Sequence, residues 1–465
     1  MKLHNTLTKT TEPFKPLQTG LATIYSCGPT VYDHIHIGNL RAFIMADSLR
    51  RCLETNGYRV QQVMNYTDVD DKTIARSQKD FPDDSPEEAL KNLTRKYEDI
   101  FTQDMQLIGN DVKSVKFVRA TESIEAMQQL IKQLYDAKFA YLADDGVYFS
   151  IQKYRDSGKK YGQLLKLDTK NTSESRINND EYDKESVHDF ALWKLHKGTE
   201  PGWEFELDGH SLFGRPGWHI ECSAMSSTNL GQPFDIHTGG VDNIFPHHEN
   251  EIAQSTALQD NYANYFVHNE HLLVDGRKMS KSLNNFFTLQ DIEDKGFDPL
   301  IFRMLVLQAH YRSQLNFTWE SLEAAQNRLQ GYDAMTVQQW QTSKTADEIN
   351  FKDIEEEMKR RAADDMDTPQ VLAALSNLTK AVDANGIATK QLDDFRSALA
   401  TADAILGLNL LSQPDIDSEQ KQLLKDRQKA RDAKDWATTD AIRDKLLEDG
   451  IAVRDTPNGQ IWSRP

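Results

Sequence analysis

The segment from residue 21 to residue 71 constrains the fold most strongly. LATIYSCG, residues 21–28, has the length and apolar content of a buried strand, and a polar loop follows at residues 29–39. Residues 40–57 carry apolar side chains at helical spacing and end at a glycine, and residues 58–71 indicate a second strand with an acidic turn. This order predicts a parallel α/β sheet, with ligands at the carboxyl ends of its strands, near Cys27 and Thr67.

The spacing of apolar and polar residues divides the rest of the chain into further segments. A looser stretch at 113–213 contains a polar run, predicted as a surface loop at 169–186, and strand and helix patterns resume at FDIHTGGVD and HHENEIAQSTALQ. One strand is expected at 264–275, and a helical region is followed by two charged helices and a strand pair. We therefore predict a Rossmann-like parallel-sheet domain with an insertion, an α-helical bundle and a small C-terminal α+β domain. The predicted divisions are 1–112 and 214–270 for the two halves of the sheet domain, 113–213 for the insertion, 271–310 for a loop region, 311–410 for the bundle and 411–465 for the last domain.

Composition narrows the class of protein. The chain of 465 residues is ordinary in its apolar and charged content, and we find neither a membrane-spanning run nor a secretory signal, so a cytoplasmic protein with no membrane partner is expected. Its three cysteines are too few and too far apart for a disulfide framework. The net charge of −18 argues against unspecific binding of nucleic acid.

Two loops carry residues suited to phosphate chemistry. His36, Ile37, Gly38 and Asn39 lie between a strand and a helix N-terminus, where backbone N–H groups and an imidazole stabilise negative charge. The second loop is KMSKS, residues 278–282, whose lysines Lys278 and Lys281 suit a pyrophosphate leaving group. Taken singly, the first loop also fits an ordinary turn, and the second fits an exposed basic loop.

A third group of residues is able to bind a metal ion. Cys27 closes the first strand, Cys222 lies in RPGWHIECSAM, and His247 and Glu251 are four residues apart, on one face of a helix. Two thiolates, an imidazole and a carboxylate suit tetrahedral zinc, with Zn–S distances of about 2.3 Å. The spacing is unlike that of a zinc finger, so two buried cysteines and a polar helix face fit the sequence equally well.

The two loops together resemble those of class I aminoacyl-tRNA synthetases, which face each other across ATP. CGPTVYDHIHIGN, NYTDVDDK, GRPGWHIECSAM, FDIHTGGVDNIFPHHENEIAQS, KMSKSLNNFFT and HYRSQLNF look like cysteinyl-tRNA synthetase, as does the tail. The resemblance implies one zinc ion on Cys27, Cys222, His247 and Glu251, and an amino-acid pocket lined by Thr67, Trp218 and His237.

The same resemblance implies a reaction and its partners. ATP with Mg²⁺ would activate L-cysteine, and the cysteinyl group would pass to the tRNA for cysteine, with 411–465 recognising the anticodon and the enzyme acting as a monomer. His36, Gly38, Asn39 and Lys281 would bind ATP, and His36, Asn39, Lys278 and Lys281 would stabilise phosphate charge during the reaction. Because an apolar pocket separates cysteine from serine by only about 1–3 kcal/mol, ligation of the substrate sulfur by zinc would supply the selectivity.

One departure and two rival functions stay open. The family's HIGH loop ends in histidine, whereas this chain has Asn39, which donates a hydrogen bond but carries no charge. A ligase that passes cysteine to a small amine would use the same activation chemistry without the C-terminal block. A non-catalytic relative would bind tRNA or zinc without turnover.

Overall fold

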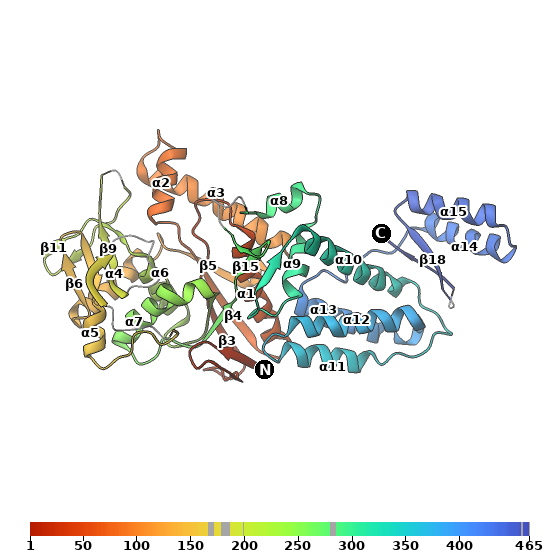
Figure 1. The fold of residues 1–465 in the computed structure, drawn as a ribbon, viewed down its shortest axis with the longest axis horizontal. Coiled ribbons are helices and arrows are strands. Elements are labelled where there is room, and N and C mark those ends of the chain that lie inside the picture. The colour runs from red at the N-terminus through yellow and green to blue at the C-terminus, as the bar shows by residue number, and fades with distance from the viewer. Residues whose placement is uncertain (166–171, 178–186, 199, 280–284, 457–458, 465) are drawn as a thin grey trace.

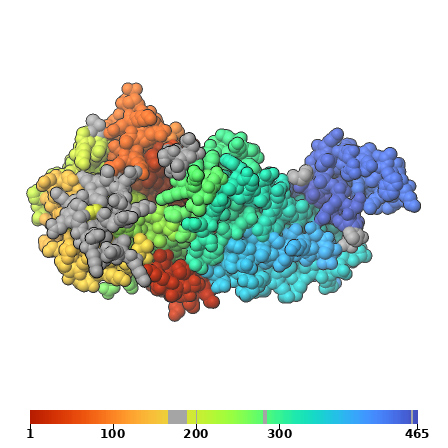
Figure 2. Space-filling view, viewed as in Figure 1, coloured from red at the N-terminus to blue at the C-terminus, as the bar shows by residue number. Residues whose placement is uncertain are grey.

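The structure is a computed structural model that describes residues 1–165, 172–177, 187–198, 200–279, 285–456 and 459–464. The molecule is elongated, with the insertion at one end, the parallel sheet in the middle, the helical bundle beyond it and the last residues at the other end (Figure 1). The space-filling view shows the C-terminal residues as a separate body beside the bundle (Figure 2). Among the described residues, no helix combines the length and the apolar character that crossing a membrane requires.

The central sheet has five strands in the order β14-β13-β3-β4-β5. All four neighbouring pairs are parallel, which confirms the predicted Rossmann-like fold. The strand order places β3 between β13 and β4. The connections that follow β3 and β13 therefore run in opposite directions, and a crevice lies between them at the carboxyl ends of these strands. The five strands are β3 Leu21–Ser26, β4 Arg59–Tyr66, β5 Val115–Arg119, β13 Phe234–Gly240 and β14 Ala263–Asn269.

Both faces of this sheet are covered, because successive strand residues point to opposite sides. Ile24 and Met64 belong to an apolar core shared with α1 (Ile37–Thr55) and the bundle. Tyr25 and Val63 belong to a second core, shared with α6 (Trp218–Leu230), α7 (Glu249–Leu258) and the insertion. The crevice is therefore bounded by α1 on one side and by α6 and α7 on the other.

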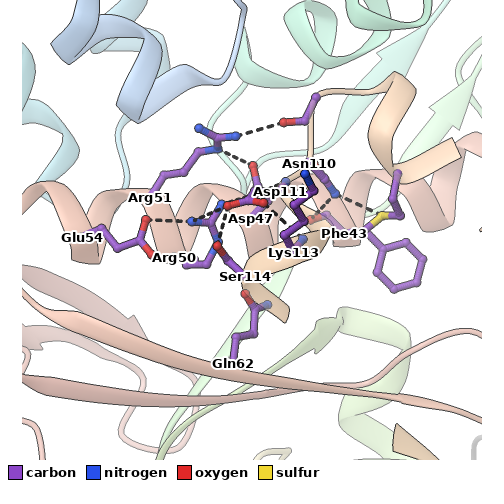
Figure 3. A network of polar contacts seen from close by, with 12 residues as sticks. Phe43, Asp47, Arg50, Arg51, Glu54, Gln62, Asn110, Asp111, Lys113 and Ser114 are labelled. Carbon is purple, nitrogen blue, oxygen red and sulfur yellow. Dashed lines mark hydrogen bonds and ion pairs between the residues drawn. The ribbon is translucent and has the colours of Figure 1, made fainter. Parts of the chain in front are cut away.

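Helix α1 is fixed by a buried polar junction as well as by apolar packing. Asp47 accepts hydrogen bonds from Arg50 and Arg51, at 2.6 Å each, and Figure 3 shows the carboxylate between these two guanidinium groups. Arg303 donates to the same carboxylate at 2.7 Å and to the carbonyl of Leu406 at 2.6 Å. Although burial alone would raise the pKa of Asp47, the three arginines hold it below its ordinary value. The junction thus joins α1 to the bundle.

The insertion forms a second, mainly antiparallel sheet in the order β12-β9-β7-β6, with β8 paired to β9. β8 spans Thr172–Ile177, so the prediction of a surface loop at 169–186 is wrong for these residues, because their backbone pairs with β9 despite the polar composition. The remainder of that predicted loop lies outside the described residues. β5 falls inside the range assigned to the insertion, yet it pairs with β4 in the central sheet. The elements here are α4 Ile124–Asp136, β6 Ala140–Ala143, β7 Gly146–Phe149, α5 Ile151–Asp156, β8, β9 Val187–Leu195, β10 Glu206–Leu207, β11 His210–Ser211 and β12 Gly214–Pro216.

The single strand expected at 264–275 is two strands in two sheets. β14 ends at Asn269, and β15 (Leu272–Val274) pairs with β16 (Arg277–Lys278) and β17 (Leu315–Phe317). The prediction is wrong because the backbone between the two strands leaves the central sheet: the N–H of Glu270 donates to the carbonyl of Tyr311 at 2.8 Å. This turn brings residues 269–272 to the crevice.

The predicted helical region and C-terminal α+β block are confirmed. The strand pair β18 and β19 is antiparallel, and part of its predicted turn lies outside the described residues. These elements are α8 Leu289–Asp294, α9 Pro299–Leu307, α10 Trp319–Thr336, α11 Phe351–Ala362, α12 Thr368–Asn385, α13 Leu392–Leu406, α14 Ser418–Asp432, α15 Trp436–Glu448, β18 Ala452–Thr456 and β19 Gly459–Ser463. Towards the N-terminus lie β1 Lys2–Asn5, β2 Thr10–Pro13, α2 Asp71–Asp80 and α3 Pro86–Leu107.

Candidate functional site

A cavity of about 410 Å³ lies at the carboxyl ends of β3, β4 and β13. It extends from the end of β3 to the start of α1 and the turn between β14 and β15. Most of the residues singled out in the sequence line it: Cys27, His36, Gly38, Asn39, Thr67, Trp218, Cys222, His247 and Lys278. Segments far apart in the chain therefore meet at one cavity, as the rule for parallel sheets predicts.

The four residues of the predicted metal set converge at one end of this cavity. Cys27 directly follows β3, Cys222 lies in α6, His247 lies in the short segment Ile244–His248, and Glu251 lies in the first turn of α7. One ligand atom from each lies within 4.8 Å of the others. Tetrahedral zinc with bonds of about 2.0–2.3 Å places its ligand atoms about 3.3–3.8 Å apart, so a small contraction would close the set.

Glu251 is at the centre of this arrangement. Its Oε1 is 3.1 Å from Nε2 of His247 and 4.0 Å from Sγ of Cys27, and its side chain is fully buried. Burial alone would raise the pKa of Glu251, but His237 and His247 bring it below its ordinary value. An ionised carboxylate thus faces a thiol and an imidazole.

Buried neighbours orient these ligands. Nδ1 of His247 pairs with Nδ1 of His219 at 2.9 Å, which leaves Nε2 of His247 directed at Glu251. The second carboxylate oxygen of Glu251 accepts from the hydroxyl of Tyr262 at 2.7 Å and pairs with Nε2 of His237 at 2.9 Å. Partners of this kind around the ligands are typical of metal sites in proteins.

The two thiols differ in acidity. A hydrogen bond with Cys27 lowers the pKa of Cys222 to about 6, although burial opposes this shift. Burial, together with the same hydrogen bond, raises the pKa of Cys27 well above its ordinary value. One thiolate shared with one thiol is the expected state of two adjacent buried cysteines without an ion, and a bound cation favours loss of the second proton.

Sequence reasoning missed a second set that overlaps the first. Cys27, His237, His248 and Glu251 also have ligand atoms within 4.8 Å of one another. Nε2 of His248 is 3.2 Å from Sγ of Cys27, and its Nδ1 pairs with Nε2 of His268 at 2.8 Å. The adjacent histidines His247 and His248 in PHHENE were the sequence signal for this second set. Only the fold shows that a ring nitrogen of each lies within 4.8 Å of Sγ of Cys27.

The three predicted pocket residues take different positions. Thr67 lines the cavity, and its hydroxyl donates to Glu221 at 2.9 Å. Trp218 lines it too and stacks on the His247 ring, with centroids 4.2 Å apart. His237 is fully buried behind Glu251, to which it is hydrogen-bonded. Its contact is with a metal-set residue, whereas Thr67 and Trp218 face the cavity.

The opposite end of the cavity is built on the start of α1. His36 caps this helix, because its Nδ1 accepts the N–H of Asn39 at 3.2 Å. The neutral ring then carries its proton on Nε2. Gly38 lets this ring lie close to the backbone, because a Cβ would lie 2.8 Å from Nδ1 of His36 and would displace the ring. Asn39 is exposed at the cavity edge.

The second predicted loop meets this helix start. Lys278 lines the cavity, the N–H of Ile37 donates to the carbonyl of Phe287 at 2.9 Å, and the His36 ring meets the Phe286 ring edge to face at 5.1 Å. Lys281 lies outside the described residues. The residues on either side of 280–284 therefore lie beside the His36–Asn39 loop, on the same wall of the cavity.

Several other lining residues were not predicted. Asn65 accepts the N–H of Gly28 at 2.8 Å, and a Cβ on Gly28 would lie only 1.7 Å from the Asn65 carbonyl oxygen. Asn65 could have been found from its place at the end of a strand. Glu270 and His271 could not, because the sequence placed them inside a continuous strand.

Two family models match this chain, one over the sheet domain and its surroundings and one over the C-terminal block. The model of the class I tRNA synthetase (C) catalytic domain matches residues 13–327. The model of the cysteinyl-tRNA ligase anticodon binding domain matches residues 413–462.

Individual proteins agree with these matches. A cysteine–tRNA ligase of Brachyspira hyodysenteriae is 40% identical, with 99% of this chain and 98% of that protein covered, and one of Leptospira interrogans is 40% identical, with 100% and 99% covered. Solved structures show the fold at low identity. A LeuRS–tRNA–LeuAMS complex of Agrobacterium radiobacter has a TM-score of 0.61 at 11% identity, covering 87% of this chain and 88% of its own. A methionyl-tRNA synthetase of Mycobacterium tuberculosis bound by methionyl-adenylate has a TM-score of 0.58 at 12% identity, covering 88% and 94%.

Proposed function

Because this chain belongs to the cysteine–tRNA ligase family of class I synthetases, we propose that it activates L-cysteine with ATP and selects it through zinc bound by Cys27, Cys222, His247 and Glu251. The cysteinyl group then passes to the tRNA for cysteine. The observation that carries the zinc part of the proposal is the convergence of these four side chains at one end of the cavity.

The donor set fits zinc chemically. Two sulfurs, one imidazole nitrogen and one carboxylate oxygen are all ligands that zinc accepts in proteins. His219 and Tyr262 hold His247 and Glu251 in place, which supports a resident ion rather than an accidental cluster. Zinc held by these four residues would supply a borderline-soft Lewis acid with a high affinity for thiolate sulfur.

That affinity for sulfur would let the site select cysteine over serine. Serine differs from cysteine by one atom, and its hydroxyl neither loses a proton readily nor prefers a soft metal. Trp218 and Thr67 are proposed to contact the amino acid from the cavity walls. His237 is proposed to act through Glu251, whose carboxylate it orients.

The activation step belongs to the other end of the cavity. A carboxylate oxygen of cysteine attacks the α-phosphorus of ATP, and the bond to the pyrophosphate oxygen breaks, leaving cysteinyl adenylate and pyrophosphate. His36 and Asn39 are proposed to donate hydrogen bonds to the phosphates, with Gly38 allowing close approach. Lys278 and Lys281 are proposed to balance the charge that develops on the pyrophosphate, together with Mg²⁺.

The transfer step completes the reaction. A hydroxyl of the terminal adenosine of tRNA attacks the carbonyl carbon, and AMP leaves with the bonding electrons. Residues 411–465 are proposed to recognise the anticodon. The enzyme is proposed to act as a monomer, which sedimentation of the purified protein tests.

The experiment combines three measurements on the full chain. Zinc content should be one ion per chain, pyrophosphate exchange into ATP should depend on cysteine and not on serine, and tRNA for cysteine should be charged. Exchange without charging of tRNA would favour the ligase for a small amine. No exchange with any amino acid would favour the non-catalytic relative.

A further inference from the structure

Arg41 is a buried cation that the proposed reaction does not use directly. It lies in the second turn of α1, two residues after Asn39, and only 1% of its surface is exposed. Burying a guanidinium group is costly unless its N–H groups are satisfied, so the partners of Arg41 indicate what this position requires.

Those partners are backbone carbonyls from two separate segments. One Nη donates to the carbonyl of His271 at 2.6 Å, and the other donates to the carbonyl of Ser313 at 2.5 Å and more weakly to that of Tyr311 at 3.4 Å. Within the described residues, no carboxylate forms an ion pair with this guanidinium. Arg41 therefore acts as a fixed fork between two stretches of main chain.

The first of these stretches is a wall of the cavity. Asn269, Glu270, His271 and Leu272 all line it, on the turn that separates β14 from β15. This turn has few backbone bonds of its own: the N–H of Glu270 donates to Tyr311, and the carbonyl of His271 also accepts from Leu315 at 3.3 Å. The bond from Arg41 is thus the polar contact of this turn with α1, beside the apolar packing of Leu272 in the core that α1 shares.

The second stretch connects this wall to the helical bundle. The hydroxyl of Tyr311 donates to Oδ1 of Asp365 at 2.6 Å, and Nε of Arg312 donates to Oδ2 at 2.8 Å. Asp365 lies between α11 and α12 and is 4% exposed. Arg41 is consequently the point at which the start of α1, the cavity wall and the bundle are held together.

We infer that Arg41 is a positioning residue for ATP: it sets the separation between the His36–Asn39 start of α1 and the Asn269–Leu272 wall. Arg41 is not among the residues that line the cavity, so it contacts neither substrate. The inference rests on the proposed function, since it assigns ATP to this end of the cavity. The metal set at the opposite end has no bond to Arg41 among the described contacts.

The test compares Arg41→Lys with Arg303→Lys. A lysine keeps the charge but not the planar fork that reaches two carbonyls at once. Arg303 is the matched control, because it is also fully buried and also donates to backbone carbonyls, but at the Asp47 junction. Both variants should lower the thermal unfolding midpoint.

In cysteine-dependent pyrophosphate exchange, Arg41→Lys should raise KM for ATP about tenfold. Its KM for cysteine and its zinc content should stay within about twofold of wild type. Arg303→Lys should leave both KM values within about twofold. Equal changes in KM for ATP in the two variants, or equal changes in KM for ATP and for cysteine in Arg41→Lys, would overturn the inference.

A second variant covers the case in which Arg41→Lys does not fold. Tyr311→Phe keeps the carbonyl that faces Arg41 but removes the hydroxyl bond to Asp365, and it should raise KM for ATP about threefold with KM for cysteine unchanged. An unfolded Arg41→Lys together with an unchanged KM in Tyr311→Phe would also overturn the inference. Failure of the wild type to catalyse exchange would instead refute the proposed function.

Discussion

The two ends of the cavity are built differently. At the metal end, Cys222, His247 and Glu251 are at most 2% exposed, and their partners are side chains on strands and helices. At the other end, Asn39 and Lys278 are exposed, and the contacts run through a helix cap, backbone carbonyls and aromatic edges. Under the proposed function, amino-acid selection would depend on a preorganised buried cluster, whereas nucleotide binding would depend on how the surrounding segments are held against one another.

This contrast predicts a graded response to substitution. A change in the buried set removes one of the four proposed metal ligands. A change at the open end removes one of several groups that share the phosphate charge, so the loss should be smaller.

The largest effect is expected for Cys222→Ser. Even a partner outside the ligand set is worth about 10–100-fold in metal affinity, so loss of a direct sulfur ligand should remove the zinc and reduce cysteine-dependent exchange to background. Metal analysis and exchange assays measure both. Cys52→Ala, at a buried cysteine of α1 outside the set, should keep its zinc. Full zinc occupancy in Cys222→Ser would contradict the assigned ligand set.

The next effect is expected for Lys278→Ala. Removing one group that stabilises developing charge costs about 100-fold or more in kcat, and here the exchange kcat should fall about 100-fold with KM for cysteine little changed. Steady-state kinetics separate the two constants. Arg277→Ala, at the neighbouring exposed cation of β16, is the control. If the two variants lost activity equally, Lys278 would have no special part in the reaction.

A smaller effect is expected for Gly38→Ala. The added Cβ would lie 2.8 Å from the His36 ring, so the ring must move and the cap on the N–H of Asn39 weakens. A lost cap of about 1 kcal/mol corresponds to about a fivefold rise in KM for ATP. Gly331→Ala in α10 has open space around its Cβ and should raise stability without changing KM. An unchanged KM in Gly38→Ala would show that the cap is dispensable.

The last effect concerns the pH dependence of stability and leaves the cavity itself unchanged. Burial, and then the charge of Glu293, raises the pKa of Asp104 in α3 to about 7. Because the folded pKa lies above the unfolded one, the stability linked to this carboxyl is complete below about pH 4 and is lost as the pH rises to about 7. Asp104→Asn does not titrate, so its stability relative to wild type should increase over this range.

The gain should be only about 1–2 kcal/mol, because the carboxyl is partly exposed and solvent screens it. Denaturant unfolding at pH 4, 5.5 and 8 measures it. Asp99→Asn, at an exposed position on the same helix, is the control. A difference between Asp104→Asn and wild type that is constant with pH would contradict the assigned shift.

Much of the site could be predicted because local patterns fix it. The strand and helix periods of residues 21–66 place Cys27 and His36 in the loop after the first strand, at its carboxyl end, and this placement does not depend on the rest of the chain. The sequence did not predict that Glu270 and His271 line the cavity or that Arg41 bonds to this wall. Their contacts are with one another and with residues 311–315, and an apolar run in the sequence does not show that its backbone leaves one sheet to join another.

The sequence alone determined most of the order of elements, the two motifs proposed to bind phosphate and the four donor types suited to zinc, because these depend on residue identity and short-range spacing. Only the tertiary structure decided that donors from β3, α6 and the region of α7 lie within 4.8 Å of one another, that His237 lies behind Glu251, and that Arg41 fastens the cavity wall. The physical reason is that these distances come from strand order and helix packing, which bring together residues as far apart in the chain as Cys27 and Glu251.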